Sequence, residues 1–186
     1  MELKNTIQRR RAYRALEKVD IGLGTIEELA IAANLSASCF NNQPWRFVFV
    51  KDKTVLEGLH DALSKGNDWA KAASMIVAVF TKKDDDCVIR DREYYLFDTG
   101  MATAHLILRA TDMGLIAHPI AGFSPKKVRE VLGIPDEMLV ITLVILGKHS
   151  PDSTELMNQN QIEVEKARPE RQGLDHFVYL DRYQKK

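Results

Sequence analysis

Side-chain amides gather immediately before a segment that alternates as a β-strand does. Asn41, Asn42 and Gln43 are followed by Pro44, and residues 45–50 then place an aromatic residue at every second position. Because an amide offers both a donor and an acceptor, such a cluster suits a ligand whose own polar edge presents donors and acceptors side by side. The same amides could instead satisfy backbone groups of their own loop.

A second group of candidate residues lies near the N-terminus, where residues 9–11 are all arginine and Arg14 follows. The planar guanidinium donates two parallel, charge-assisted hydrogen bonds, which suits a phosphate group. The pattern predicts a helix over residues 3–14, in which Arg10 and Arg14 lie one turn apart and can meet one ligand. A solvated basic helix end is the alternative interpretation.

Composition limits the classes of protein that these residues can serve. The chain has 186 residues, which favours a single domain over residues 1–186, and its 26 basic and 26 acidic residues cancel. This balance argues against a general nucleic-acid or membrane-binding surface. We expect no membrane partner, because the longest apolar run, residues 139–146, is too short to span a bilayer and no signal peptide precedes it.

The two cysteines, Cys39 and Cys87, are far apart and form no CxxC pattern. Their spacing disfavours both a disulfide framework and a zinc site, so we expect a cytoplasmic protein without a metal. Asp84, Asp85 and Asp86 lie in a polar stretch, residues 81–91, that we interpret as a solvated loop.

The remaining pattern predicts a mixture of helices and strands around a buried sheet. Residues 75–80 and 139–146 read as buried strands, and residues 92–113 as a long helix that is apolar nearly all round. Such a helix needs cover on every side, which indicates a homodimer. Further expected elements are a helix opened by a capping box at 25–28, a strand at 45–50, a short helix near 55–59, a helix from Ser124-Pro125 to Gly133, and a polar tail ending in a strand at 177–180.

Taken in order, these motifs resemble the nitroreductase family of flavin-dependent oxidoreductases. The resemblance covers almost the whole chain and rests on Arg10-Arg11-Ala12-Tyr13-Arg14, Ser38 to Trp45, Tyr94 to Gly100, Gly114-Leu115 with Pro119 to Phe123, Leu132 to Pro135, Val144 to Gly147, and Arg171 before Leu174. It implies an α+β sandwich with a mainly antiparallel central sheet flanked by helices. It also implies an obligate homodimer with FMN at each subunit interface and a C-terminal arm that extends onto the dimer partner.

The resemblance also implies roles for individual residues. Arg10 and Arg171 would hold the FMN phosphate with the backbone N–H of Ala12, while Arg14 would lie near the N1/O2 side of the ring. Because three arginines are adjacent, Arg9 or Arg11 could share the phosphate. The facing subunit would contribute Ser38 and Asn41, Cys39 and Gln43 would also bind the cofactor, and the side-chain amides would read the pyrimidine edge. The ring would lie against Pro119, Ile120, Ala121 and Gly122, near its N5 atom. Two positions depart from the family pattern, since Ala12 replaces a usual serine and Ala37 a usual proline.

The expected activity is ping-pong hydride transfer from NADH or NADPH, through flavin N5, to a small-molecule acceptor such as a nitroaromatic or quinone. Because the cofactor carries the electron chemistry, no catalytic side chain is needed. Two other functions stay open: a flavin enzyme of other chemistry, such as reductive dehalogenation or flavin breakdown, and a non-enzymatic module for phosphate or nucleic acid. His105 is expected to be a hydrogen-bonded core or interface residue, and His118 could be that or a proton donor.

Overall fold

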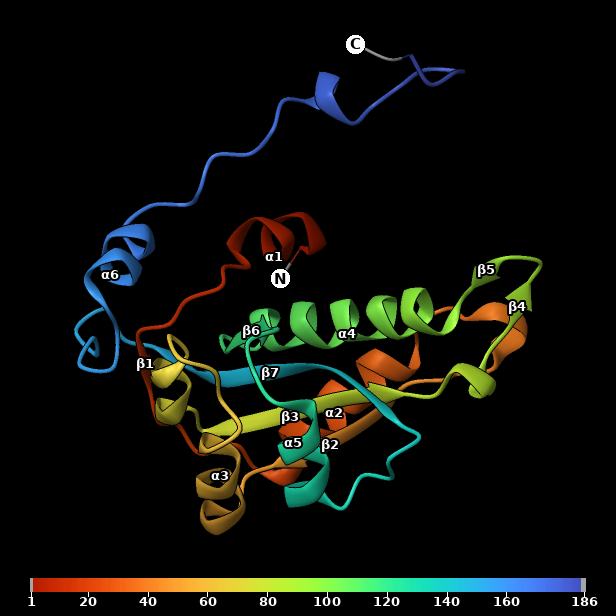
Figure 1. Ribbon diagram of the computed structural model, residues 1–186. Helices are drawn as coiled ribbons and strands as arrows, with labels where there is room; N and C mark the ends of the chain where they lie inside the picture. Colours follow the sequence, from red (N-terminus) through yellow and green to blue (C-terminus); the bar gives the residue numbers. More distant parts are fainter. Residues whose placement is uncertain (1, 185–186) are drawn as a thin grey trace.

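The computed structural model describes residues 2–184 and has the predicted α+β architecture, with an antiparallel sheet between layers of helices (Figure 1). The strands are β1 (Leu16–Glu17), β2 (Arg46–Val50), β3 (Met75–Thr81), β6 (Ile116–Ile120) and β7 (Leu139–His149). Their order is β1-β7-β3-β2, and β6 also pairs with β7. Strand β6 uses the edge of β7 opposite β3, with His118 paired to Ile145, and β1 pairs with the last residues of β7, Leu16 with His149.

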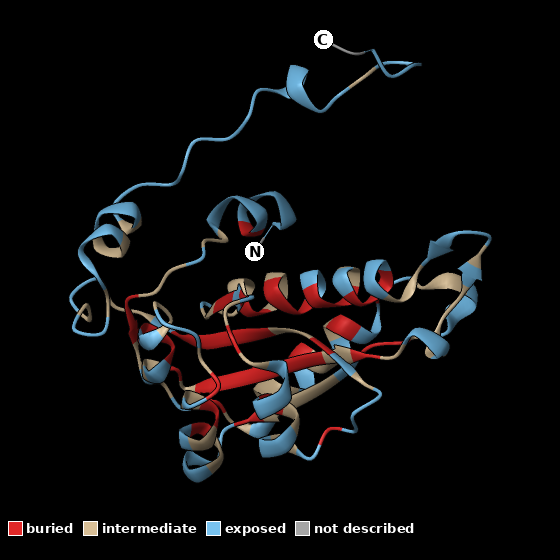
Figure 2. Cartoon of the chain, viewed as in Figure 1, coloured by how far each residue is buried: buried red, intermediate tan, exposed pale blue. Residues whose placement is uncertain are grey.

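Strand β3 lies in the middle of the sheet, as its continuous apolar run predicts. Successive side chains of a strand point to opposite faces, so β3 contributes to two separate cores. Ile76 and Ala78 belong to one hydrophobic cluster, whereas Val77 and Val79 belong to the other. The buried residues therefore form two layers, one on each face of the sheet (Figure 2).

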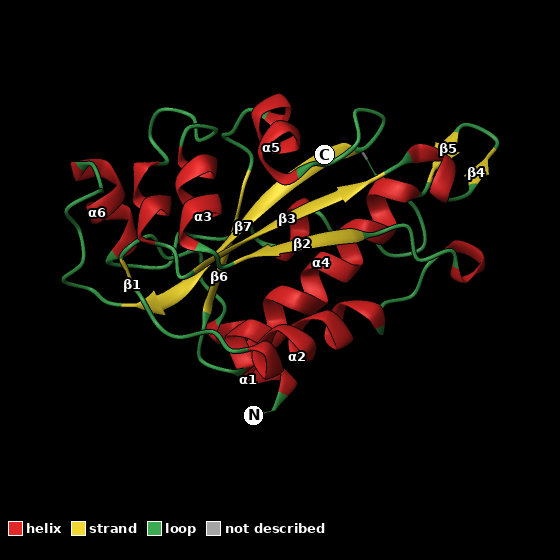
Figure 3. Ribbon diagram, turned by 90° about the horizontal axis from the view of Figure 1, so that it is seen from below, coloured by secondary structure: helices red, strands yellow, loops and turns green. Residues whose placement is uncertain are grey.

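Different helices cover the two faces (Figure 3). Helices α2 (Leu23–Asn34) and α4 (Tyr95–Asp112) pack on one face through residues such as Leu29 and Leu106, and α1 (Leu3–Arg9) lies against α4. Helices α3 (Lys53–His60) and α5 (Pro125–Leu132) cover the other face through Leu59 and Val128. Helix α6 (Gln159–Glu165) lies beyond β7, near β1. Among residues 2–184, no helix is long and apolar enough to cross a membrane.

The capping signals predicted from the sequence are confirmed for α5 but not for α2. Ser124 caps α5 by accepting a hydrogen bond from the backbone N–H of Lys127, and Gly133 ends the helix in the left-handed region at φ 65°. Helix α2, however, begins at Leu23 after Gly22, so the capping box predicted at residues 25–28 is wrong. Thr25 lies inside the first turn, where its own N–H bonds to the carbonyl of Gly22.

The first helix is shorter than predicted and ends at Arg9. Residues 10–15 run outside any helix, because the chain must extend to pair Leu16 with His149 on the edge of β7. Arg10 and Arg14 are therefore not one helical turn apart. They lie instead along an extended segment.

The long helix begins at Tyr95 rather than Arg92, because residues 92–93 form β5 (Arg92–Glu93) and pair with β4 (Val88–Ile89). Its Ala102 and Leu106 are buried, while Phe97 on another side is 62% exposed. In one chain the sheet, α2 and α1 cover this helix only in part.

The C-terminal tail does not form the strand predicted at residues 177–180. Residues 174–176 make a single 3₁₀ turn, and the chain then continues without regular structure. Figure 1 shows the tail leaving the body of the protein, so no strand edge of the described chain lies beside it. Its apolar side chains, including Leu174 and Leu180, are exposed.

Candidate functional site: an arginine cleft and an amide loop

Arginines from both ends of the chain line one cavity of about 150 Å³, which we call the arginine cleft. Arg10, Arg11, Ala12 and Arg14 come from the extended N-terminal segment. Val164, Glu165, Arg168, Pro169 and Arg171 come from α6 and the tail that follows it. The structure thus brings Arg10, Arg14 and Arg171 together, and it adds Arg168, which the sequence reading missed.

A carboxylate whose side chain is 9% exposed joins the two sides of the cleft. Glu165 accepts hydrogen bonds from the backbone N–H groups of Arg14, at 3.0 Å, and Ala15, at 2.9 Å. From the tail, Arg168 donates to the backbone carbonyl of Arg10 at 2.8 Å. These charge-assisted bonds fix the course of the arginine segment against α6. Glu165 was also absent from the predicted site, since an isolated glutamate on a polar helix gives no sequence signal.

The arginines of the cleft differ in whether protein acceptors already bind their guanidinium groups. Arg11 donates to the Tyr13 hydroxyl and to the carbonyls of Glu165 and Ala167, so protein acceptors occupy its guanidinium. Burial, followed by the charges of Arg168 and Arg171, lowers the pKa of Arg10. Crowded cations of this kind are the arrangement that an anion such as phosphate would stabilise.

Strand β6 lies directly beside the arginine segment. The Nδ1 atom of His118 is 3.0 Å from the backbone carbonyl oxygen of Tyr13, and the imidazole stacks on Trp69 with ring centroids 4.6 Å apart. Because a carbonyl can only accept, His118 donates from Nδ1 in this contact. Burial lowers the pKa of His118 to about 4, so the ring is neutral at pH 7. A neutral, hydrogen-bonded histidine matches the structural alternative for this residue.

Trp69 also connects β6 to the cleft, since the Arg14 guanidinium carbon lies 5.9 Å from its ring centroid. Of the four residues predicted to contact the flavin ring, Pro119 and Ala121 are exposed, Ile120 is buried and Gly122 is intermediate. Asn67 and Ser64 hold this segment by donating to the Gly122 carbonyl oxygen, at 2.9 and 3.0 Å. Pro119 to Gly122 therefore form a fixed strand end next to the arginine segment.

The predicted residues 38–43, which we call the amide loop, lie at the other end of the sheet, beside β4 and β5 (Figures 1 and 3). Ser38 accepts a hydrogen bond from the backbone N–H of Gln43, and the Gln43 side chain donates to the Asn41 carbonyl, both at 3.0 Å. Phe40, Asn41 and Gln43 all have φ between 47° and 59°. Within one chain, the amide loop and the arginine cleft do not meet.

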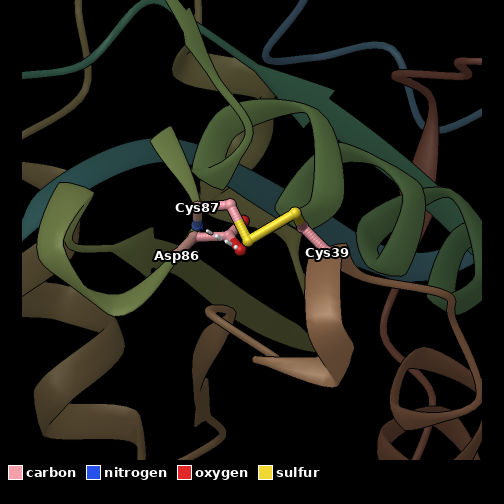
Figure 4. A group of neighbouring side chains, drawn as sticks. All are labelled: Cys39, Asp86 and Cys87. Carbon is pink, nitrogen blue, oxygen red and sulfur yellow. Dashed lines mark hydrogen bonds between the residues drawn. A yellow bond between two sulfur atoms is a disulfide. The ribbon is translucent and has the colours of Figure 1, made fainter. Parts of the chain in front are cut away.

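A disulfide joins Cys39 of the amide loop to Cys87, which precedes β4 (Figure 4). The expectation that the cysteine spacing disfavours a disulfide is therefore wrong. Strands β2 and β3 pair Arg46 with Phe80, and Cys39 precedes Arg46 by as many residues as Cys87 follows Phe80. Both cysteines thus leave the sheet at the same end, which linear spacing does not reveal.

The acidic stretch beside Cys87 is also less solvated than predicted. Asp86 is only partly exposed, and Asp85 forms a 3.2 Å ion pair with Arg46. One oxygen of Asp86 and the two sulfur atoms lie within 4.8 Å of one another. The sulfur atoms are bonded to each other, however, so they do not offer a metal two thiolate ligands.

Comparison with known proteins agrees with this architecture. The model of the Nitroreductase family matches residues 7–85 and 64–148. An Archaeoglobus fulgidus relative, whose name joins NADH dehydrogenase with NAD(P)H nitroreductase, is 30% identical over 151 residues, which cover 78% of this chain and 84% of the relative. The oxygen-insensitive NADPH nitroreductase of Helicobacter pylori is 23% identical, over 74% of this chain and 82% of the relative.

Among solved structures, one described as an oxidoreductase containing FMN superposes with a TM-score of 0.83 at 26% identity, covering 97% of this chain and 92% of the other. A nitroreductase family protein from Clostridium novyi gives a TM-score of 0.76 at 25% identity, covering 84% of this chain and 92% of the other. The chain belongs to the nitroreductase family and is therefore an oxidoreductase.

Proposed function

We propose that the protein is an FMN-dependent oxidoreductase that uses NADH or NADPH to reduce a small oxidised acceptor. The observation that carries this proposal is the convergence of Arg10, Arg168 and Arg171 in one cleft beside β6. A solved structure that matches this chain along most of its length is described as containing FMN. The guanidinium groups of the cleft fit a phosphate dianion, because each can donate charge-assisted hydrogen bonds to it.

The chemistry that bound FMN supplies is ping-pong hydride transfer at N5, from NADH or NADPH to an acceptor such as a nitroaromatic or quinone. We assign the phosphate to Arg10, Arg168 and Arg171, with the backbone N–H of Ala12 as a further donor. Arg14 supplies a positive charge for the N1/O2 side of the ring. Arg11 has a supporting role, because its guanidinium already binds Tyr13 and two carbonyls of the α6 region.

The second half of the proposed site is the amide loop of another subunit. In one chain this loop lies at the opposite end of the sheet from the arginine cleft, so a site that uses both requires two copies. A homodimer would also cover apolar side chains that one chain leaves exposed, among them Leu35, Phe40 and Phe97. The exposed tail, with Leu174 and Leu180, would pack on the same partner. Light scattering coupled to size-exclusion chromatography should give twice the mass of one chain.

Anaerobic reduction tests the proposed activity. Purified protein reconstituted with FMN should retain the cofactor through gel filtration and show its absorbance bands. NADH or NADPH should then bleach those bands, and a nitroaromatic or quinone should restore them. Retention of FMN without bleaching by either nucleotide would contradict the proposed reaction and favour another flavin chemistry. A protein that does not retain FMN would contradict the proposed cofactor.

A matched pair of variants tests whether FMN retention depends on the arginine cleft. Arg10→Ala removes a proposed phosphate contact, whereas Lys4→Ala removes an exposed cation on α1 that does not line the cleft. Only Arg10→Ala should release FMN more readily. Equal retention by the two variants would place the phosphate elsewhere.

A further inference from the structure

The amide loop is held by a covalent bond whose two ends come from different parts of the fold. Cys39 opens the 3₁₀ turn of the loop, and Cys87 lies between β3 and β4. The disulfide brings their Cα atoms to 6.1 Å. Both residues are only partly buried, so a small reductant can reach the bond.

The backbone of the loop needs external support. Phe40, Asn41 and Gln43 lie in the left-handed region, which asparagine tolerates but a bulky residue such as Phe40 adopts only at a cost in free energy. The Phe40 side chain does not provide that support, because it is 85% exposed. Apart from the disulfide, the hydrogen bonds that join the loop to residues 82–94 come from Asn42, at 3.3 Å to both Asp86 Oδ1 and Cys87 Sγ.

Two carboxylates lie close to the disulfide when the loop is closed (Figure 4 shows Asp86 beside the sulfur atoms). Asp98 accepts a hydrogen bond from the Cys39 N–H at 2.7 Å, and Asp86 accepts one from the Cys87 N–H at 2.8 Å. Burial, and then the nearby Asp86, raises the pKa of the Asp98 carboxyl. The Asp86 Oδ2 atom is buried without a hydrogen-bond partner. Joining the cysteines thus brings together two acidic groups that repel each other when both are ionised.

We propose that Cys39 and Cys87 form a redox-sensitive clasp, in which the disulfide holds the amide loop closed and reduction by a dithiol opens it. A thiolate of the dithiol attacks one sulfur, the S–S bond breaks, and the other cysteine leaves as a thiolate that takes up a proton. The second thiol of the reagent then displaces the first cysteine. The products are two protein thiols and the oxidised reagent, so two electrons and two protons enter the protein.

The clasp itself is independent of the cofactor, but its consequence for FMN rests on the proposed function. If the amide loop of one subunit completes the flavin site of the other, opening the clasp removes contacts from that site. Reduced protein should then bind FMN about tenfold more weakly than oxidised protein.

The thiol state can be measured without interference, because Cys39 and Cys87 are the only cysteines of the chain. Intact-mass analysis after alkylation should add no label to oxidised protein and two labels after treatment with dithiothreitol. Hydrogen–deuterium exchange in the two states should then show about tenfold faster exchange for residues 38–45 after reduction. Residues 75–81 of β3 exchange through global unfolding, so in both states they should exchange more slowly than residues 38–45, which marks the change in the loop as a local opening. Two labels before reduction, or equal exchange of residues 38–45 in both states, would overturn the clasp.

The double variant Cys39→Ser/Cys87→Ser is the matched control. It should show the fast exchange of the reduced parent and should not respond to dithiothreitol, which separates the clasp from other effects of the reagent. Measuring FMN affinity on the same samples separates the two proposals. Fast exchange with weaker FMN binding supports both of them. Fast exchange with unchanged FMN binding supports the clasp and overturns the assignment of the amide loop to the flavin site.

Discussion

The arginine cleft and the amide loop are built in different ways. The cleft joins segments from the two ends of the chain through charge-assisted hydrogen bonds, chiefly those of Glu165 and Arg168. The amide loop is a short stretch in a left-handed conformation, tied down by a disulfide. The cleft should therefore respond to changes of charge and of tail docking, whereas the loop should respond to changes of oxidation state.

The largest expected effect concerns the disulfide, whose ends are separated by 48 positions. Closing a loop of that length in the unfolded chain corresponds to about 4 kcal/mol of stability in the chain-entropy model. Cys39→Ser/Cys87→Ser should therefore unfold in urea with a free energy lower by about that amount than oxidised parent. Reduced parent should match the variant. Equal stability of all three samples would show that the bond does not constrain the unfolded chain.

The next largest effect concerns pH and the cleft side of the molecule. Burial lowers the pKa of folded His118 from 6.5 to about 4, so the unfolded chain binds more protons between these values. The stability contribution is complete above pH 6.5 and falls as the pH drops toward 4, by up to about 3 kcal/mol. His118→Asn should lose this part of the pH dependence. Parallel stability curves for parent and variant from pH 4 to 7 would contradict the burial effect.

A smaller effect is expected when the phosphate side loses one cation. Arg10→Ala should weaken FMN binding by about 2 kcal/mol, or roughly 30-fold, as for loss of a charge-assisted hydrogen bond. Fluorescence titration of apoprotein with FMN measures this change. Lys4→Ala should bind as the parent does, and an equal loss in both variants would indicate only a general electrostatic attraction.

The smallest effect should come from the carboxylate that positions the arginine segment. Glu165→Gln keeps an acceptor but removes the charge that receives the N–H groups of Arg14 and Ala15. We expect FMN affinity to fall by about 1 kcal/mol, or roughly fivefold. Glu163→Gln is the matched control, because Glu163 is exposed and pairs with the nearby Lys166. If the two variants bind FMN equally, Glu165 does not position the cleft.

Much of the fold was predictable because its signals are local or periodic. The buried strands at residues 75–80 and 139–146 and the Ser124-Pro125 helix start all follow from short patterns. The family and the antiparallel sheet were likewise identified from ordered motifs. Helix α1 was predicted too long from its hydrophobic pattern, because the need to reach β7 ends the helix at Arg9.

The features that the sequence did not reveal depend on contacts between distant segments. Arg168 and Glu165 acquire their positions only when α6 packs beside the arginine segment. The Cys39–Cys87 bond depends on the pairing of β2 with β3. The strand predicted at residues 177–180 failed for the opposite reason, since its apolar residues find no sheet edge in the described chain.

Strand β7 pairs with the two strands that carry separate parts of the proposed site. β1 continues from the arginine segment and pairs at His149, while β6 carries the proposed ring contacts and pairs at Leu143 to Gly147. A change of register in β7 would shift both parts in the same direction and by the same step. Their spacing is thus set at a distance, by buried residues such as Val144 that touch neither the phosphate nor the ring in the proposed site. Substitutions of these buried residues would change activity by moving the two parts of the site relative to each other, while every candidate binding residue stays unchanged.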